Sequence, residues 1–211
     1  MKIVEVAHPL VRHKVGLMRE AGISPAAFRA LVAEVSRLIA VEATRDVELD
    51  TAQIECWSGM LTVPRLPTLA PTLVPILRAG LGMLEGVQAM LPEAPVSMVG
   101  IKRDERTLLP QAYYLNLASK IDQRLALILD PMLATGGSLC ATIEALKSAG
   151  CTRMCALTLV SAPEGIRHVN ELHPDVPLFT AAVDTRLNEH GYILPGLGDA
   201  GDKIFGTDTH D

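Results

Sequence analysis

The sequence predicts an α/β fold in which a parallel, twisted sheet is flanked by helices. Two observations support this prediction. The chain of 211 residues is 49% hydrophobic but only 3% aromatic, so its core must be mostly aliphatic, which suits a parallel sheet that is covered on both faces. Apolar strand-like segments also alternate with helix-like segments. Because no composition break or long linker interrupts this alternation, we expect one domain over residues 1–211.

The predicted elements follow one another in a regular order. A helix is expected to begin at Ser24 and Pro25, a suitable N-cap and first helical residue, since apolar residues then recur at helical spacing as far as Ile39. Four apolar strand candidates come next, at 73–77, 96–102, 125–129 and 154–160. Helical segments follow the first, third and fourth of them. Ligands bind such sheets outside the carboxyl ends of the strands, so the loops after these strands should gather at one edge.

Two stretches depart from this pattern. The segment 56–71 is rich in proline, and we interpret it as variable scaffold. The segment from Leu187 onward contains many glycines and scattered apolar residues without a period. A long ordered loop of this kind is usually functional.

Composition argues against several classes of protein. The formal net charge of -5 supplies no overall basic field, so no nucleic-acid partner is expected. Charges interrupt the apolar runs too often for a membrane-spanning helix, and the N-terminus lacks the apolar region of a signal peptide, so we expect a cytoplasmic protein. The six histidines show no metal-ligand spacing. Buried free thiols, rather than disulfides or zinc ligands, are expected at Cys56, Cys140, Cys151 and Cys155.

The strongest functional signal is the segment LALILDPMLATGGS at 125–138. An apolar strand ends in Asp130, and a turn rich in threonine and glycine then leads into a helix. Gly136 and Gly137 permit close backbone approach, and the amides of a helix N-terminus bind anions, so the segment predicts a phosphate site. The carboxylate of Asp130 can accept hydrogen bonds from sugar hydroxyls. A plain N-capped turn would account for Ser138 and one glycine, but not for the acid or the whole string.

Two further segments place arginines at strand ends. In VPILRAGLGM (74–83), Arg78 follows a strand, and its guanidinium offers paired donors that match the oxygens of a pyrophosphate. A surface arginine at a strand end is the plain alternative. Arg103 lies in the charged segment 102–110, where a solvated loop accounts for the three charged residues that follow it. Lys102 is not assigned to the site.

These segments resemble the motifs of a known family. The string at 130–138 resembles the motif with which type I phosphoribosyltransferases bind phosphoribosyl pyrophosphate (PRPP). That family usually has two adjacent acids, whereas Pro131 follows Asp130 here, a departure typical of its uracil branch. Segment 74–83 resembles the pyrophosphate loop of the uracil phosphoribosyltransferases, and GYILPGLGDAGDKIFG (191–206) resembles their uracil-binding hood. The likeness extends along the whole chain.

The resemblance implies a fold, a reaction and a set of site residues. It implies the type I phosphoribosyltransferase fold with a C-terminal base-binding hood, and transfer of ribose 5-phosphate from PRPP to N1 of uracil, which gives UMP and diphosphate in pyrimidine salvage. Catalytic roles would fall to Arg78, Arg103 and Asp130, with Arg103 in a loop that closes over the substrate. The implied PRPP contacts are Arg78, Arg103, Asp130, Pro131, Met132, Leu133, Ala134, Thr135, Gly136, Gly137, Ser138 and Asp199. The implied uracil contacts are Ile193, Gly198, Asp199 and Ala200, mainly through backbone groups.

The resemblance also implies features beyond the two substrates. Mg²⁺ is the implied cofactor, held by PRPP oxygens and water, so we assign it no protein ligand. A strained, cis non-proline peptide is implied near Arg78. Some relatives are activated by GTP, which makes GTP a candidate activator, and a homo-oligomer is expected.

Two other functions remain open at this point. The string GLGMLEG (80–86) suggests a nicotinamide-dependent oxidoreductase, although its third glycine comes one residue too late for the dinucleotide fingerprint. A PRPP-binding regulator of the same fold that binds RNA is the second, and the acidic net charge and the complete hood segment count against it. Nicotinamide absorbance and an assay with PRPP and uracil would separate the three.

Overall fold

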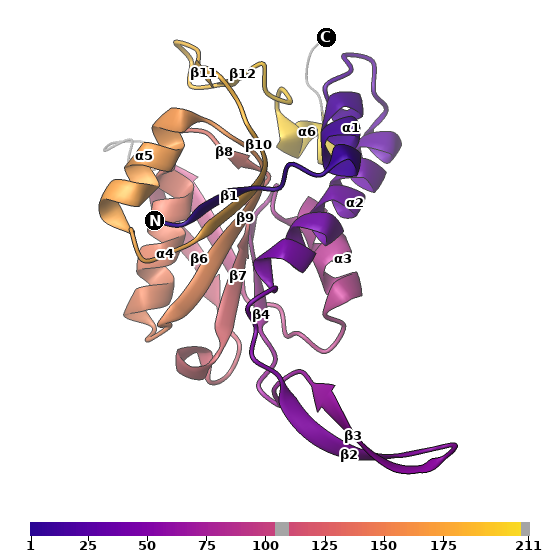
Figure 1. Ribbon diagram of the computed structural model, residues 1–211. Coiled ribbons are helices and arrows are strands. Elements are labelled where there is room, and N and C mark those ends of the chain that lie inside the picture. The colour runs from indigo at the N-terminus through magenta and orange to yellow at the C-terminus, as the bar shows by residue number, and fades with distance from the viewer. Residues whose placement is uncertain (104–109, 208–211) are drawn as a thin grey trace.

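The fold is a mostly parallel sheet with helices on both faces, as the sequence predicted (Figure 1). The computed structural model describes residues 1–103 and 110–207. Over these residues, neighbouring strands of the main sheet are parallel except for the last pair, which is antiparallel. The strands run in the order β1 (Ile3–Glu5), β10 (Leu178–Val183), β9 (Arg153–Ser161), β7 (Leu125–Leu129), β4 (Thr72–Leu77), β5 (Met98–Arg103) and β6 (Pro110–Asn116), and β8 (Met132–Leu133) also pairs with β9.

Helices cover the two faces of the sheet in two groups (Figure 1). One face carries α1 (Pro9–Met18), α2 (Pro25–Ala43) and α3 (Leu81–Met90), and the other carries α4 (Gly137–Ser148) and α5 (Pro163–Leu172). Alternate residues of β7 show that both faces are buried, because Leu127 and Leu129 belong to the core on the α2 side and Ala126 and Ile128 to the core on the α4 side. A short 3-10 helix, η1 (Ile121–Gln123), precedes β7.

Local signals in the sequence account for the starts of these elements. Helix α2 begins where predicted: Ser24 is its N-cap, and the Ser24 hydroxyl accepts a hydrogen bond from the Ala27 amide at 3.2 Å. The four predicted strands correspond to β4, β5, β7 and β9.

Three of the four cysteines are buried and Cys56 is partly exposed, and all four are free thiols. No helix of the described residues is long and apolar enough to cross a membrane.

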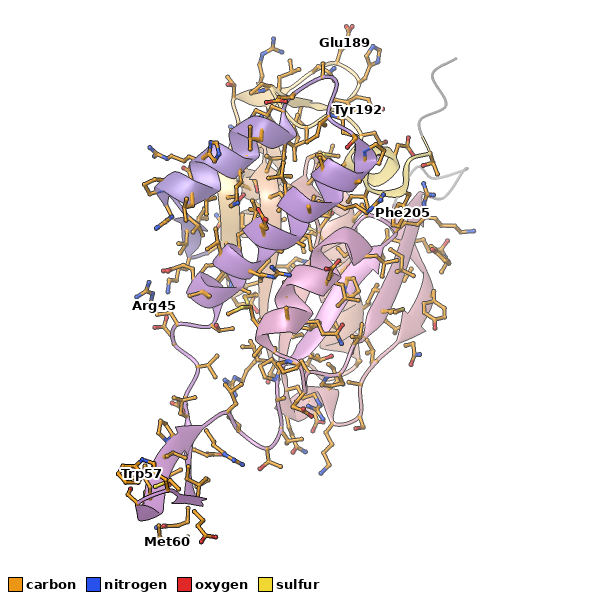
Figure 2. All side chains as sticks on the ribbon, turned by 90° about the vertical axis from the view of Figure 1, so that its right-hand side faces the viewer. Arg45, Trp57, Met60, Glu189, Tyr192 and Phe205 are labelled. Atoms are coloured by element: carbon orange, nitrogen blue, oxygen red, sulfur yellow. The ribbon has the colours of Figure 1, made fainter. Side chains whose placement is uncertain are left out.

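The structure differs from the sequence interpretation at residues 56–71. Much of this stretch belongs to a hairpin, β2 (Asp50–Cys56) and β3 (Gly59–Arg65), whose strands pair with each other and lie outside the main sheet. The hairpin projects from the body of the molecule, with Trp57 and Met60 at its tip (Figures 1 and 2). In β2, the partly buried Ala52, Ile54 and Cys56 alternate with exposed polar residues, whereas β3 shows no such alternation and is almost entirely exposed.

The C-terminal segment lies over the edge of the sheet at which the central strands end (Figure 1). It contains a small antiparallel pair, β11 (Arg186–Leu187) and β12 (Ile193–Leu194), followed by α6 (Ala200–Phe205). We call residues 186–206 the hood. The segment is therefore ordered structure, as its scattered apolar residues indicated.

Candidate active site

A pocket of about 220 Å³ opens at the carboxyl ends of β4 and β7. These two strands are neighbours in the sheet, so the loops that follow them meet at its edge. The pocket is lined by residues 76–79 after β4 and residues 130–139 after β7. The structure therefore brings together Arg78 and the complete predicted phosphate segment from Asp130 to Ser138.

Backbone hydrogen bonds to β9 hold the loop after β7 in place. The Asp130 amide donates to the carbonyl of Leu157 at 3.1 Å, and the carbonyl of Pro131 accepts from the amides of Leu159 and Val160 at 3.0 and 3.1 Å. Beyond Met132, the carbonyl of Leu133 accepts from the amide of Ala162 at 2.8 Å. Proline suits position 131, since the hydrogen bonds there use its carbonyl and require no amide hydrogen. We call residues 130–138 the phosphate loop.

Close packing fixes the far end of the phosphate loop. Gly136 has φ = 86°, in the left-handed region that favours glycine, and it is the N-cap of α4. A Cβ atom on Gly165 of α5 would lie only 2.3 Å from the carbonyl oxygen of Ala134, so α5 packs directly behind the loop. Because Gly136 has no side chain, it leaves the amides of the first turn of α4 available for an anion.

Asp130 is the acidic side chain of this pocket. Burial raises the pKa of its carboxyl from 3.8 to about 7, and a hydrogen bond from the Met132 backbone opposes part of that rise. A carboxyl in such surroundings is stabilised by donors or cations that arrive with a ligand. Ribose hydroxyls and a metal ion bound to a substrate both meet this need.

Arg78 contacts the hood as well as the pocket. It follows a cis peptide bond between Leu77 and Arg78, as the resemblance implied. Its guanidinium lies 3.8 Å from the carboxylate of Asp202 and 5.7 Å from the centre of the Phe205 ring, both on α6. The sequence analysis missed Asp202 and Phe205, although their spacing of three residues would have placed them on one helix face.

The hood is joined to this edge of the sheet through α6. A Cβ atom on Gly82 would lie 2.6 Å from Cδ1 of Ile204, so α3 and α6 are in close contact. Arg29 of α2 donates to the Ile204 carbonyl at 2.9 Å. The hood thus rests beside the loop that carries Arg78.

The four residues assigned to uracil lie together in the hood, and none of them lines the 220 Å³ pocket. Ile193 is buried and pairs with Leu187 between β12 and β11. Gly198 has φ = 72°, and Ala200, at the start of α6, is fully buried. One carboxylate oxygen of Asp199 caps α6, accepting from the Asp202 amide at 3.0 Å.

Comparisons with known proteins agree with this geometry. The family model described as uracil phosphoribosyltransferase matches residues 5–207. This chain belongs to the uracil phosphoribosyltransferase family. The AQ2163 protein from Aquifex aeolicus shares 37% sequence identity and superposes with a TM-score of 0.93, over 99% of this chain and 100% of that one. A structure of adenine phosphoribosyl transferase from Trypanosoma brucei, in complex with AMP, pyrophosphate and ribose-5-phosphate, is 13% identical with a TM-score of 0.51, over 75% of this chain and 68% of that one, and supports the fold alone.

The second arginine expected in this family's site is only partly described. Arg103 ends β5, which lies next to β4 in the sheet, so its backbone is close to the edge that carries Arg78. The loop after it, residues 104–109, lies outside the described residues. The prediction that this loop closes over the substrate concerns those residues and stays a prediction.

The donor groups of the site fit magnesium bound together with a substrate. Within residues 1–103 and 110–207, no three His, Cys, Asp or Glu side chains are grouped as a metal site. The pocket instead offers the single carboxylate of Asp130. Mg²⁺ is commonly held by one or two carboxylates together with substrate phosphates and water, so these residues suit an ion that arrives with PRPP.

Proposed function

We propose that this member of the uracil phosphoribosyltransferase family binds PRPP between the loops after β4 and β7 and transfers its ribose 5-phosphate to N1 of uracil. The products are UMP and diphosphate. One observation supports the location above all others: a glycine-capped helix N-terminus, an acid and an arginine line a single pocket at the carboxyl edge of the sheet. These groups suit the 5-phosphate, the ribose hydroxyls and the pyrophosphate of PRPP.

Each part of the phosphate loop has a distinct task in this proposal. The amides at the start of α4, with the hydroxyls of Thr135 and Ser138, bind the 5-phosphate, because helix N-termini favour anions. Asp130 accepts hydrogen bonds from the ribose hydroxyls. Residues 131–134 form the wall of the pocket. They include β8, which pairs with β9.

Charge on the departing pyrophosphate is the main electrostatic demand of the reaction. The bond from C1 of the ribose to the pyrophosphate oxygen breaks as N1 of uracil forms a bond to C1 from the opposite face, and the N1 proton is lost to water. Arg78 and Arg103 stabilise the negative charge that develops on the leaving group, and positioning of both substrates lowers the barrier further. Mg²⁺, held by PRPP oxygens and water, would neutralise part of the same charge.

Base recognition is assigned to the hood. Backbone groups of Ile193, Gly198 and Ala200 bind uracil, while Asp199 turns toward PRPP. Amides and carbonyls of a fixed loop cannot exchange donor and acceptor roles, and cytosine reverses those roles at two positions relative to uracil. Sites of this kind reject a mismatched substrate by about 10⁴ to 10⁵.

The same resemblance supplies proposals about assembly and regulation. We assign the protein to pyrimidine salvage in the cytoplasm, as a homo-oligomer with GTP as a candidate activator. Sedimentation would test the homo-oligomer, and activity measured with and without GTP would test the activator.

The geometry argues against the oxidoreductase alternative. A Cβ atom on Gly80 would lie 2.3 Å from the carbonyl oxygen of Leu129, and Gly82 packs against Ile204. These two glycines of GLGMLEG are therefore required for packing inside the protein, and they do not line a space for a dinucleotide.

The direct test is to incubate the protein with PRPP, Mg²⁺ and one nucleobase at a time, measuring diphosphate and nucleotide. We expect UMP from uracil, with turnover of cytosine lower by about 10⁴ or more. Comparable turnover of both pyrimidines would contradict the assignment of recognition to the hood backbone. Turnover of a purine alone would contradict the proposed substrate.

A further inference from the structure

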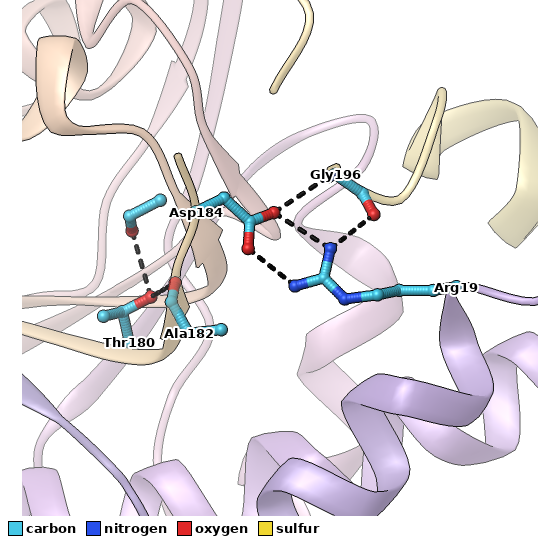
Figure 3. Close-up of polar contacts among 6 residues, drawn as sticks. Arg19, Thr180, Ala182, Asp184 and Gly196 are labelled. Atoms are coloured by element: carbon cyan, nitrogen blue, oxygen red, sulfur yellow. Dashed lines mark hydrogen bonds and ion pairs between the residues drawn. The ribbon is translucent and has the colours of Figure 1, made fainter. Parts of the chain in front are cut away.

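A partly buried ion pair joins the hood to the body of the protein (Figure 3). Asp184 directly follows β10, and only 8% of its surface is exposed. Its two carboxylate oxygens accept hydrogen bonds from the two terminal nitrogens of Arg19, at 2.6 and 3.0 Å. Arg19 is the C-cap of α1, so the pair connects the end of a helix to the end of a strand. Paired hydrogen bonds between Arg and a carboxylate restrict direction as well as distance.

The same two side chains hold both polar groups of Gly196. The amide of Gly196 donates to Oδ2 of Asp184 at 2.9 Å, and its carbonyl accepts from Nη1 of Arg19 at 2.7 Å (Figure 3). The amide and carbonyl of Gly196 and both carboxylate oxygens of Asp184 all have partners in this group, so the network closes on itself. A second link lies beside it, because the Thr185 amide donates to the Leu194 carbonyl at 2.9 Å.

Gly196 is also fixed from inside the hood. Its φ is 63°, in the left-handed region, and a Cβ atom there would lie 2.1 Å from the carbonyl oxygen of Ile193. The orientation of this peptide is therefore determined on one side by the turn of the hood and on the other by Asp184 and Arg19. A chain without side-chain bulk needs such external contacts to keep one conformation.

Position in the chain gives this network its significance. Gly196 lies between Ile193 and the pair Gly198 and Ala200, which are the residues proposed to contact uracil. A small rotation of the Gly196 peptide would turn the backbone donors and acceptors on both sides of it. Neither Asp184 nor Arg19 lines the 220 Å³ pocket proposed for PRPP.

We propose that Asp184 and Arg19 are positioning residues that set the orientation of the base-recognition loop, and thereby the affinity and selectivity for the base. This inference rests on the proposed function of the hood. It assigns the two residues no contact with PRPP and no part in bond breaking. Their removal should therefore weaken base binding far more than PRPP binding.

The test compares two conservative changes with the same changes at an exposed pair. In Asp184→Asn, the NH₂ group faces either the Gly196 amide or Arg19, so like groups are opposed. Arg19→Lys keeps the charge but loses the paired geometry. Glu42→Gln and Arg45→Lys are the controls, because these residues form a similar two-bond pair at 2.6 and 3.0 Å on the exposed surface of α2 and the turn after it.

Steady-state kinetics supply the first measurement. We expect Asp184→Asn to raise KM for uracil by about ten-fold or more and to reduce the preference for uracil over cytosine, while KM for PRPP changes by less than about two-fold. Arg19→Lys should show the same pattern with a smaller effect, and both controls should match the wild type. A fall in thermal stability with the two KM values changing in the same proportion would overturn the proposal, because that is the result expected of a purely structural pair.

Hydrogen exchange supplies a measurement that does not depend on activity. In Asp184→Asn and Arg19→Lys, amides in residues 193–200 should exchange at least about ten-fold faster than in the wild type, while those in the phosphate loop keep their rates. Unchanged exchange in residues 193–200 would overturn the proposal even if the kinetics changed. If the wild type does not use uracil, the proposed function fails, and the exchange rates still decide whether the pair positions the loop.

Discussion

The phosphate loop and the hood reach the same edge of the sheet but are held there by different interactions. The phosphate loop is fixed by backbone hydrogen bonds to β9, such as those accepted by the Pro131 carbonyl. The hood is fixed largely by side chains of distant elements: Arg19 and Asp184 at Gly196, Arg29 at Ile204, and Arg78 at Asp202. Backbone contacts persist through most substitutions, whereas each side-chain contact can be lost by one. The proposed sugar-phosphate site is therefore part of the sheet, and the proposed base site is attached to it.

The largest effect is expected at Asp130, where function depends on a side chain in an otherwise backbone-held loop. Asp130→Asn removes the charge that accepts hydrogen bonds from the ribose, and such bonds contribute about 1.5 to 3 kcal/mol. We expect kcat/KM to fall by roughly ten-fold to 150-fold with normal folding. Kinetics with both substrates check this, and near-normal kinetics would remove Asp130 from the site.

A second variant displaces the phosphate loop from behind. In Gly165→Ala, the new Cβ atom would meet the backbone carbonyl of Ala134 at 2.3 Å. The preceding carbonyl, of Leu133, is bonded to the Ala162 amide, so this part of the loop has little room to move. Overpacking of this kind costs about 1 to 3 kcal/mol, so both thermal stability and PRPP affinity should fall.

Substitutions at two other glycines test whether the losses in Gly165→Ala come from the rigidity of the backbone that the new Cβ atom meets. Gly82→Ala places its Cβ atom 2.6 Å from the flexible end of the Ile204 side chain in the hood, and the cost should be smaller because that side chain can rotate. Gly22→Ala meets nothing within 4 Å and should be close to neutral. Equal losses of PRPP affinity at Gly165 and Gly82 would contradict the distinction between the two regions.

The phosphate loop could be predicted from the sequence more completely than the attachment of the hood, because its residues are consecutive in the chain. Strand, acid, glycine turn and helix are consecutive in 125–138, so a local pattern contains the whole phosphate loop. Arg19 and Asp184 are separated by 165 positions, and nothing near either residue signals the other. The hairpin of β2 and β3 was also missed. Ala52, Ile54 and Cys56 alternate with polar residues in β2, but β3 has no such period and is almost entirely exposed.

Burial of Asp130 should also make the stability of the free protein depend on pH. Its folded pKa of about 7 lies above the ordinary value of 3.8, so between these values the folded state binds more protons than the unfolded state. The free energy of unfolding should therefore fall as pH rises from about 4 to about 7. Asp130→Asn lacks this contribution, so its Tm should exceed that of the wild type at about pH 8 and match it at about pH 4. In a protein of this size each kcal/mol of this contribution shifts Tm by about 2 to 4 °C. Equal Tm values at both pH values would show that burial does not raise this pKa.

The smallest effect is expected at the contact between Arg78 of the pocket and Phe205 of the hood. The Arg78 side chain is 64% exposed, and its guanidinium lies 5.7 Å from the centre of the Phe205 ring. A cation and an aromatic ring at an exposed site attract each other by about 0.5 to 1 kcal/mol, which limits the movement of Arg78 before PRPP binds. Phe205→Leu keeps apolar bulk and removes the ring, so KM for PRPP should rise by about two-fold to five-fold.

Tyr192→Leu is a suitable control, because Tyr192 is a partly exposed aromatic residue of the hood at a distance from Phe205 (Figure 2). A rise in KM for uracil alone in Phe205→Leu would mean that α6 serves the base and not the orientation of Arg78, and it would extend the side-chain dependence of the hood to its C-terminal helix.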